Sequence, residues 1–165
     1  MIITLIGMMG SGKSTVGRQL SCRLNWRFFD LDEVISRKTG VSIPRIFSVA
    51  GERTFRAWER KSAAEIYEKL NRGVVATGGG AILSPQNRKI FSRNGPVFYL
   101  HAEPSVLLDR IDLTDRPLLH KSSDPEARMR DIFKRREKLY EMGCKIEVGD
   151  RSPEEVVSCI IKALT

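Results

Sequence analysis

The chain has 165 residues, of which 41% are hydrophobic and 29% charged, as in an ordinary globular domain. Its formal net charge is +8. The basic residues are spread along the chain without an aromatic-interleaved basic motif, which argues against a nucleic-acid partner, because a site for small anions would also need positive charge. No apolar stretch is long enough to cross a bilayer, and the short apolar start does not fit a signal peptide. We therefore expect one domain that works in the cytoplasm without a membrane or nucleic-acid partner.

The cysteines and histidines form no metal-binding or disulfide pattern. Cys22, Cys144 and Cys159 are an odd number with wide, irregular spacing and no Cys-x-x-Cys pair. We expect them to be buried free thiols in a reducing compartment. His101 and His120 match no metal-ligand spacing, so we interpret them as structural or surface residues.

A phosphate-binding motif follows the first predicted strand. Residues 2–6 are a short apolar run, and residues 7–14 read GMMGSGKS, which fits G-x-x-x-x-G-K-[ST]. Glycines let backbone N–H groups curl around phosphate oxygens, and the helix expected over residues 13–24 directs its positive N-terminus at them. Lys13 can reach the β and γ phosphates, and the Ser14 hydroxyl can ligate magnesium. The motif predicts a nucleotide site but does not say what receives the phosphate.

The rest of the chain alternates strands and helices. Later strands are predicted at 26–29, 73–77, 97–100 and 144–148, and helices at about 44–50, 52–70, 85–93, 104–110, 125–142 and 153–164. This alternation predicts a parallel sheet covered by helices on both faces, with right-handed crossovers. The pattern alone does not order the strands.

Two carboxylates follow the second predicted strand. Asp30 and Asp32 alternate at its carboxyl end, where open α/β sheets bind ligands. The alternative is that one of them caps a helix beginning near Glu33. Beside a phosphate loop that needs magnesium, we favour the functional interpretation.

Three further features point to an anionic ligand. Arg56 lies beside the apolar stripe of the helix at 52–70, with Glu59 placed to hold its guanidinium, although such a pair by itself looks like an ordinary surface ion pair. Residues 78–80 are three glycines directly after a strand, which indicates backbone passing close to a ligand. Arg136 falls on the apolar face of the helix at 125–142, where a charge needs either an internal acid or an anionic ligand.

A polar stretch without periodicity occupies residues 111–123. Loops of this kind over a phosphate site often close as lids. Arg116 within it could supply positive charge to a transferring phosphoryl group. The alternative is an exposed arginine in a solvated loop.

Taken together, these motifs resemble the shikimate kinase family of small P-loop kinases. The resemblance runs nearly end to end and rests on residues 7–14, 29–32, 51–56, 77–80, 116–119, 136 and 139–140. It implies a three-layer α/β sandwich with a five-stranded parallel sheet in the order 2-3-1-4-5, like the nucleoside monophosphate kinases. It also implies a single P-loop kinase domain over residues 1–165, with substrate-binding helices at about 31–60 and a lid at about 111–124. The implied reaction transfers the γ-phosphate of ATP to the 3-hydroxyl of shikimate, in aromatic amino-acid biosynthesis.

The resemblance implies roles for individual residues. Lys13, Asp32 and Arg116 would be catalytic, with Asp32 as the candidate base and Arg116 as a lid arginine on ATP. One Mg²⁺ would be held by Ser14 and, through water, by Asp30. The residues expected to contact ATP are Gly10, Ser11, Gly12, Lys13, Ser14, Thr15, Arg110, Arg116, Arg151 and Pro153. Those expected to contact shikimate are Asp32, Arg56, Gly78, Gly79, Gly80 and Arg136.

The two substrate arginines would grip the shikimate carboxylate, because two guanidinium groups give bidentate, charge-assisted recognition. Arg136 is preferred to the adjacent Arg135 by its helical face and its spacing from residues 139–140. A monomer is expected. Two alternatives remain open at this point: another small-molecule kinase of this fold, such as a gluconate or nucleotide kinase, and a P-loop protein that binds nucleotide for regulation or for nucleic-acid binding.

Overall fold

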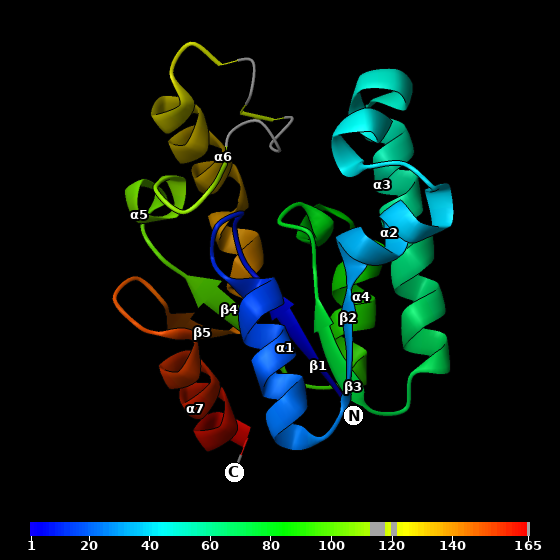
Figure 1. Cartoon of the computed structure of the whole chain (residues 1–165), viewed down its shortest axis with the longest axis vertical. Helices are drawn as coiled ribbons and strands as arrows, with labels where there is room; N and C mark the ends of the chain where they lie inside the picture. Colours follow the sequence, from blue (N-terminus) through cyan, green and yellow to red (C-terminus); the bar gives the residue numbers. More distant parts are fainter. Residues whose placement is uncertain (113–117, 120–121, 165) are drawn as a thin grey trace.

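The computed structural model describes residues 1–112, 118–119 and 122–164. Its middle layer is a five-stranded parallel sheet in the order β2-β3-β1-β4-β5 (Figure 1). The strands are β1 (Ile2–Ile6), β2 (Arg27–Asp30), β3 (Gly73–Ala76), β4 (Val97–His101) and β5 (Cys144–Glu147). The structure confirms the predicted parallel sheet and its strand order.

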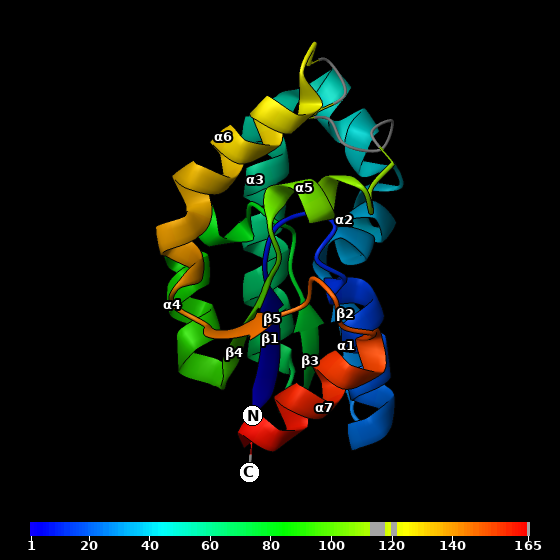
Figure 2. The same ribbon diagram turned by 90° about the vertical axis from the view of Figure 1, so that its left-hand side faces the viewer.

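Helices cover both faces of the sheet because successive side chains of each strand point to opposite sides. On one face α1 (Lys13–Leu24) packs beside α7 (Pro153–Leu164), and on the other α3 (Ile43–Lys69) packs beside α4 (Pro85–Asn94) (Figure 2). In β1, the Thr4 hydroxyl lies 2.7 Å from the Tyr67 hydroxyl of α3. Side chains of the buried residues 2–6 therefore pack against the helices on both faces of the sheet.

The segment after β2 turns immediately into α2 (Leu31–Thr39), which ends at Gly40 in the left-handed conformation. The next helix, α3, was expected as two pieces separated at Gly51. In the structure Gly51 has φ 78° and ψ 166° inside α3, so the helix is sharply kinked there. Phe47 and Phe55 pack across this kink, with ring centroids 4.8 Å apart.

The second half of the chain contains η1 (Ala81–Leu83), α5 (Pro104–Leu108) and α6 (Pro125–Tyr140). The turn η1 follows β3 and the glycine run and was not predicted. The helix α5 is shorter than expected, since it ends at Leu108 and leaves Arg110 in a turn beyond it. Half of the expected lid, including Arg116 and His120, lies outside the described residues.

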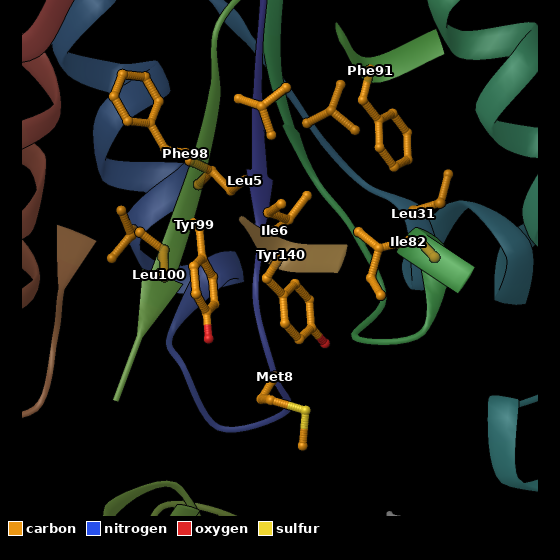
Figure 3. Packing of buried hydrophobic residues seen from close by; sticks show 14 of the residues in the cluster. Leu5, Ile6, Met8, Leu31, Ile82, Phe91, Phe98, Tyr99, Leu100 and Tyr140 are labelled. Carbon is orange, nitrogen blue, oxygen red and sulfur yellow. The ribbon is translucent and has the colours of Figure 1, made fainter. Parts of the chain in front are cut away.

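The core joins the sheet to the helices on both faces. Figure 3 shows part of it, including the Tyr99 and Tyr140 rings side by side. His101 is buried at the end of β4, with Nδ1 2.7 Å from a Glu147 carboxylate oxygen, so its structural interpretation is confirmed. No helix among the described residues is long and apolar enough to cross a membrane.

The prediction of buried thiols is wrong. All three cysteines are free, but Cys22 and Cys144 are exposed and Cys159 is half-buried. Cys22 lies on the outer face of α1, and Cys144 begins the edge strand β5. Composition alone favours burial of cysteine, whereas position on a helix face or a sheet edge decides it here.

Candidate active site

Two adjoining cavities lie at the carboxyl edge of the sheet, where the loops after β1, β2 and β3 meet (Figure 1). The phosphate-loop cavity, of about 590 Å³, is lined by Met9, Gly10, Gly12, Lys13, Ser14, Thr15, Asp30, Asp32, Thr77, Gly78, Gly79, Arg110, Ile111, Arg151 and Pro153. The two-arginine cavity, also of about 590 Å³, is lined by Met9, Asp32, Glu33, Ile43, Pro44, Phe47, Phe55, Arg56, Glu59, Gly78, Gly79, Gly80, Leu118 and Arg136. They share a wall formed by Met9, Asp32, Gly78 and Gly79.

The phosphate loop is shaped by two glycines and one buried lysine. Gly10 and Gly12 have φ values of 80° and 82°, in the left-handed region that favours glycine. Lys13 Nζ donates to the Met8 carbonyl at 2.6 Å and to Ser11 Oγ at 3.2 Å. Ser11 itself is buried below the cavity. No described side chain caps the N-terminus of α1, so its backbone N–H groups are available to an anion.

Asp30 combines the two interpretations that the sequence left open. Its Oδ1 accepts from the backbone N–H groups of Asp32 and Glu33, at 3.0 and 3.4 Å, and so caps α2. Its Oδ2 accepts a short hydrogen bond from the Ser14 hydroxyl. The carboxylate and the hydroxyl therefore meet at the mouth of the phosphate loop, and oxygen atoms of this kind are the ligands that Mg²⁺ prefers.

Asp32, in the first turn of α2, belongs to the wall shared by the two cavities. A Cβ atom at Gly78 would lie 2.9 Å from Asp32 Oδ1 and 2.9 Å from Glu59 Oε1. Any larger residue at position 78 would displace one of these carboxylates. The first glycine of the run thus lets two acidic side chains approach the backbone after β3.

Arg56 and Glu59 form a buried ion pair, not the surface pair that their spacing suggested. Arg56 Nη1 donates to both carboxylate oxygens of Glu59, at 3.1 and 2.9 Å, and its Nε and Nη2 donate to Glu52. The Glu59 side chain is only 1% exposed. Burial raises the pKa of Glu59 to about 7; nearby Asp32 adds to the rise, while Arg56 and Arg136 oppose it.

The glycine run also makes room for Arg56. A Cβ atom at Gly80 would collide with the Arg56 guanidinium, whose Cζ would be 2.6 Å away. The sequence predicted that residues 78–80 pass close to a ligand. In the structure Gly78 and Gly80 pass close to charged side chains that line the two-arginine cavity, and Gly79 passes close to the backbone of the phosphate loop.

Arg136 occupies the inward face of α6, as predicted. It is 6% exposed, whereas the adjacent Arg135 has a side chain that is 73% exposed and pairs with Asp131 at 3.0 Å. Arg56 and Arg136 come from helices far apart in the sequence and line the same cavity. Two guanidinium groups facing one small cavity suit an anionic ligand, and a carboxylate in particular.

The far end of the phosphate-loop cavity is formed by three predicted residues. Arg110 donates to the Val148 carbonyl at 3.1 Å and to that of Gly149, so it fastens the turn after β5. Arg151 donates to the Glu147 carbonyl at 3.1 Å, and Pro153 begins α7. The structure brings Arg110, Arg151 and Pro153 together; Arg116 is outside the described residues.

Sequence reasoning missed part of the two-arginine cavity. Glu59 was noticed only as a partner of Arg56, although it falls with Phe55, Ser62 and Ile66 on the buried side of α3. That i, i+4, i+7, i+11 spacing was the available signal. The apolar wall from Ile43, Pro44 and Phe47, just before the kink, carried no local signal.

Comparison with known proteins identifies the family. The profile described as "Shikimate kinase" matches residues 9–165. The chain belongs to the shikimate kinase family. A shikimate kinase of Neisseria gonorrhoeae is 39% identical over 99% of this chain and 95% of its own length. One from Halorhodospira halophila is 50% identical over 84% of this chain and 77% of its own length.

A solved shikimate kinase structure has closely the same fold. The enzyme from Acinetobacter baumannii, described as a complex with shikimate, superposes with a TM-score of 0.94 at 38% identity. The alignment covers 99% of this chain and 92% of the other. A kinase binds a phosphoryl donor beside an acceptor, so membership of this family explains why the phosphate-loop cavity adjoins a second cavity.

Proposed function

We propose that this member of the shikimate kinase family transfers the γ-phosphate of ATP to the 3-hydroxyl of shikimate, giving shikimate 3-phosphate and ADP. The observation that carries the proposal is the wall common to both cavities. Asp32, Gly78 and Gly79 face a phosphate loop on one side and two arginines, Arg56 and Arg136, on the other. A phosphoryl donor and a small acidic acceptor would meet at this wall.

The phosphate-loop cavity would bind ATP. Backbone N–H groups of residues 10–15, at the N-terminus of α1, would donate hydrogen bonds to its phosphates. Lys13, which lines the same cavity, would add positive charge beside them. Arg110, Arg151 and Pro153 would flank the adenine at the far end of the cavity. Arg116 would contribute charge from the lid, which we place at about residues 111–124.

One Mg²⁺ would be bound with the nucleotide. The Ser14 hydroxyl and the Asp30 carboxylate already touch, and hydroxyl and carboxylate oxygens are suitable ligands. We propose that Ser14 ligates the ion directly and that Asp30 supports it through water. The ion would supply positive charge that offsets the negative charge developing on the phosphate oxygens.

The two-arginine cavity would bind shikimate. Arg56 and Arg136 would hold its carboxylate by charge-assisted hydrogen bonds, and the backbone of residues 78–80 would contact the ring hydroxyls. Apolar Phe47, Phe55 and Leu118 would cover the ring. The shape fits a small, flat acid with polar groups at the opposite end from its carboxylate.

The reaction itself is a displacement at phosphorus. The 3-hydroxyl oxygen of shikimate forms a bond to the γ-phosphorus while the bond between that phosphorus and the β,γ-bridging oxygen breaks, and ADP leaves. We propose that Asp32 accepts the hydroxyl proton, and its position in the wall between the two cavities supports this role. Lys13 would stabilise the transferring group, since phosphoryl transfer depends chiefly on positioning and charge.

We further propose that residues 1–165 act as a single kinase domain and as a monomer, with acceptor-binding helices at about 31–60. ATP is made and used inside the cell, so we place the reaction in the cytoplasm. These proposals concern assembly and location, and size-exclusion chromatography with light scattering tests the monomer directly.

An acceptor-panel assay tests the proposed reaction. The purified chain is incubated with ATP and Mg²⁺ and with shikimate, gluconate or a nucleoside monophosphate, and ADP release is measured. We expect ADP formation that depends on shikimate and Mg²⁺. Turnover with gluconate or a nucleotide, and none with shikimate, would assign the two-arginine cavity to a different acceptor.

A further inference from the structure

A buried tyrosine forms a hydrogen bond with the backbone of the wall between the two cavities. Tyr140, the last residue of α6, is fully buried, and its hydroxyl donates to the Gly79 carbonyl oxygen at 2.5 Å. Its ring stacks on that of Tyr99 in β4, with centroids 4.9 Å apart and planes 11° apart (Figure 3). The hydrogen bond from Tyr140 to Gly79 joins residues 61 positions apart in the sequence.

The same hydroxyl also lies near Arg136. This arginine is one helical turn before Tyr140, on the same buried face of α6. Burial raises the pKa of Tyr140 to about 12, an effect that Arg136 partly opposes, so the hydroxyl keeps its proton near neutral pH. A phenol has one proton to give and can also accept. The hydroxyl therefore donates its proton to the Gly79 carbonyl, which leaves its oxygen lone pairs available to the Arg136 guanidinium.

The carbonyl that Tyr140 holds belongs to the glycine that packs against the phosphate loop. Gly79 lines both cavities, and a Cβ atom there would lie 3.2 Å from the Met9 amide nitrogen and 3.4 Å from the Gly7 carbonyl oxygen. On either side, Gly78 and Gly80 touch the charged side chains described above. A small shift of Gly79 would carry its two neighbours with it and so alter the acceptor side of the wall.

We propose that Tyr140 is a positioning residue that holds Arg136 and the Gly79 carbonyl in fixed relation through its hydroxyl. The identity of the acceptor rests on the function proposed above, but the link between Arg136 and the wall does not. The residue does not touch substrate; it acts by keeping the arginine and the glycine run at the spacing that the acceptor requires.

The opposing interpretation is that Tyr140 is only a core aromatic. The chain itself supplies the matched comparison. Tyr99, in the same stack, is also buried, and its hydroxyl has no hydrogen-bond partner among the described residues. Tyr140→Phe and Tyr99→Phe each remove one buried hydroxyl and keep the ring, but only the first breaks the link to Arg136 and Gly79.

Steady-state kinetics of both variants test the proposal. For Tyr140→Phe we expect kcat/KM for shikimate to fall about 5- to 30-fold, since a buried carbonyl loses its partner. The melting temperature should also fall, by about 2–8 °C, because the unsatisfied carbonyl costs stability, whereas KM for ATP should change little. Tyr99→Phe should keep all kinetic constants within about twofold. Equal kinetics for the two variants, or a loss in Tyr140→Phe that is equal for both substrates and parallels its melting temperature, would overturn the proposal.

A measurement on the ligand-free protein separates this proposal from the function itself. Hydrogen exchange of the backbone amides at residues 77–81 should be faster in Tyr140→Phe than in the unmodified chain and unchanged in Tyr99→Phe. If the unmodified chain fails to phosphorylate shikimate, the proposed function fails while the exchange result still decides the role of Tyr140. If exchange at residues 77–81 is unchanged in Tyr140→Phe, Tyr140 is not a positioning residue, even if the unmodified chain phosphorylates shikimate.

Discussion

Replacing Gly80 by alanine is the sharpest test of how the acceptor cavity is built. Gly80 has φ −97° and ψ 0°, which any L-residue can adopt, so the substitution adds no backbone strain. It adds a single methyl group, and the three nearest atoms to that methyl all belong to the Arg56 guanidinium. The effect is therefore confined to the position of one charged group.

The size of the effect follows from the geometry. The new Cβ would stand 2.6 Å from Arg56 Cζ, so the guanidinium must retreat by about 0.8 Å or more to reach ordinary contact. That movement breaks the close hydrogen bonds to Glu59, at 3.1 and 2.9 Å. A hydrogen bond to a charged group contributes about 1.5–3 kcal/mol, and each 1.4 kcal/mol is about tenfold in affinity. We expect the affinity for shikimate to fall about 10- to 100-fold.

The assay measures KM for each substrate and a binding constant for shikimate by calorimetry. ATP should be affected less than about twofold, because Gly80 lines only the two-arginine cavity. The control is the same change in an Arg56→Ala background, where the methyl has room and should cost little more. If Gly80→Ala binds shikimate normally, or is equally harmful without the arginine, the steric explanation is wrong.

Three further substitutions test individual charges. Glu59→Gln removes a group whose pKa is about 7 when folded against 4.5 in the reference state, so the folded chain takes up a proton between these values. The free energy of unfolding of the wild type minus that of the variant should therefore fall by on the order of 3 kcal/mol as pH rises from 4.5 to 7. If urea unfolding gives a difference that stays constant over this pH range, the raised pKa of Glu59 is excluded. Arg136→Ala should raise KM for shikimate about 100-fold and leave ATP binding intact, whereas the exposed Arg135→Ala should do neither; similar kinetics for both would contradict the assignment. Asp32→Asn should lower kcat at least about 100-fold with little change in ATP affinity measured by calorimetry, and an equal loss of ATP binding would make Asp32 a nucleotide residue.

The parallel sheet and the phosphate loop were predictable because their signals are local. The run at residues 2–6 is buried throughout and apolar except for Thr4, as expected for a strand covered on both faces, and the loop pattern spans eight consecutive residues. Arg136 could be placed inward from helical periodicity alone. The strand order came from the resemblance and not from periodicity, because no local pattern encodes which strands pair.

What could not be predicted depends on contacts between distant segments. The Arg56–Glu59 pair has the same i, i+3 spacing whether it faces water or a cavity, and only the packing of residues 78–80 against it shows that it is buried. The hydrogen bond from Tyr140 to Gly79 has no local signature either. The role of Arg116 stays a prediction.

The kink in α3 has a consequence for the shape of the acceptor cavity. Gly51 has φ 78° and ψ 166°, yet a Cβ atom there would meet nothing within 4 Å, so glycine is required by chirality and not by space. A D-alanine introduced by semisynthesis would fit this corner, whereas L-alanine would be strained by about 1–3 kcal/mol. The angle between the apolar wall at residues 43–47 and the helix that carries Arg56 thus depends on one backbone conformation that glycine permits and an L-residue disfavours. A mirror-image residue would keep that angle, and with it the width of the cavity mouth, while stiffening the chain.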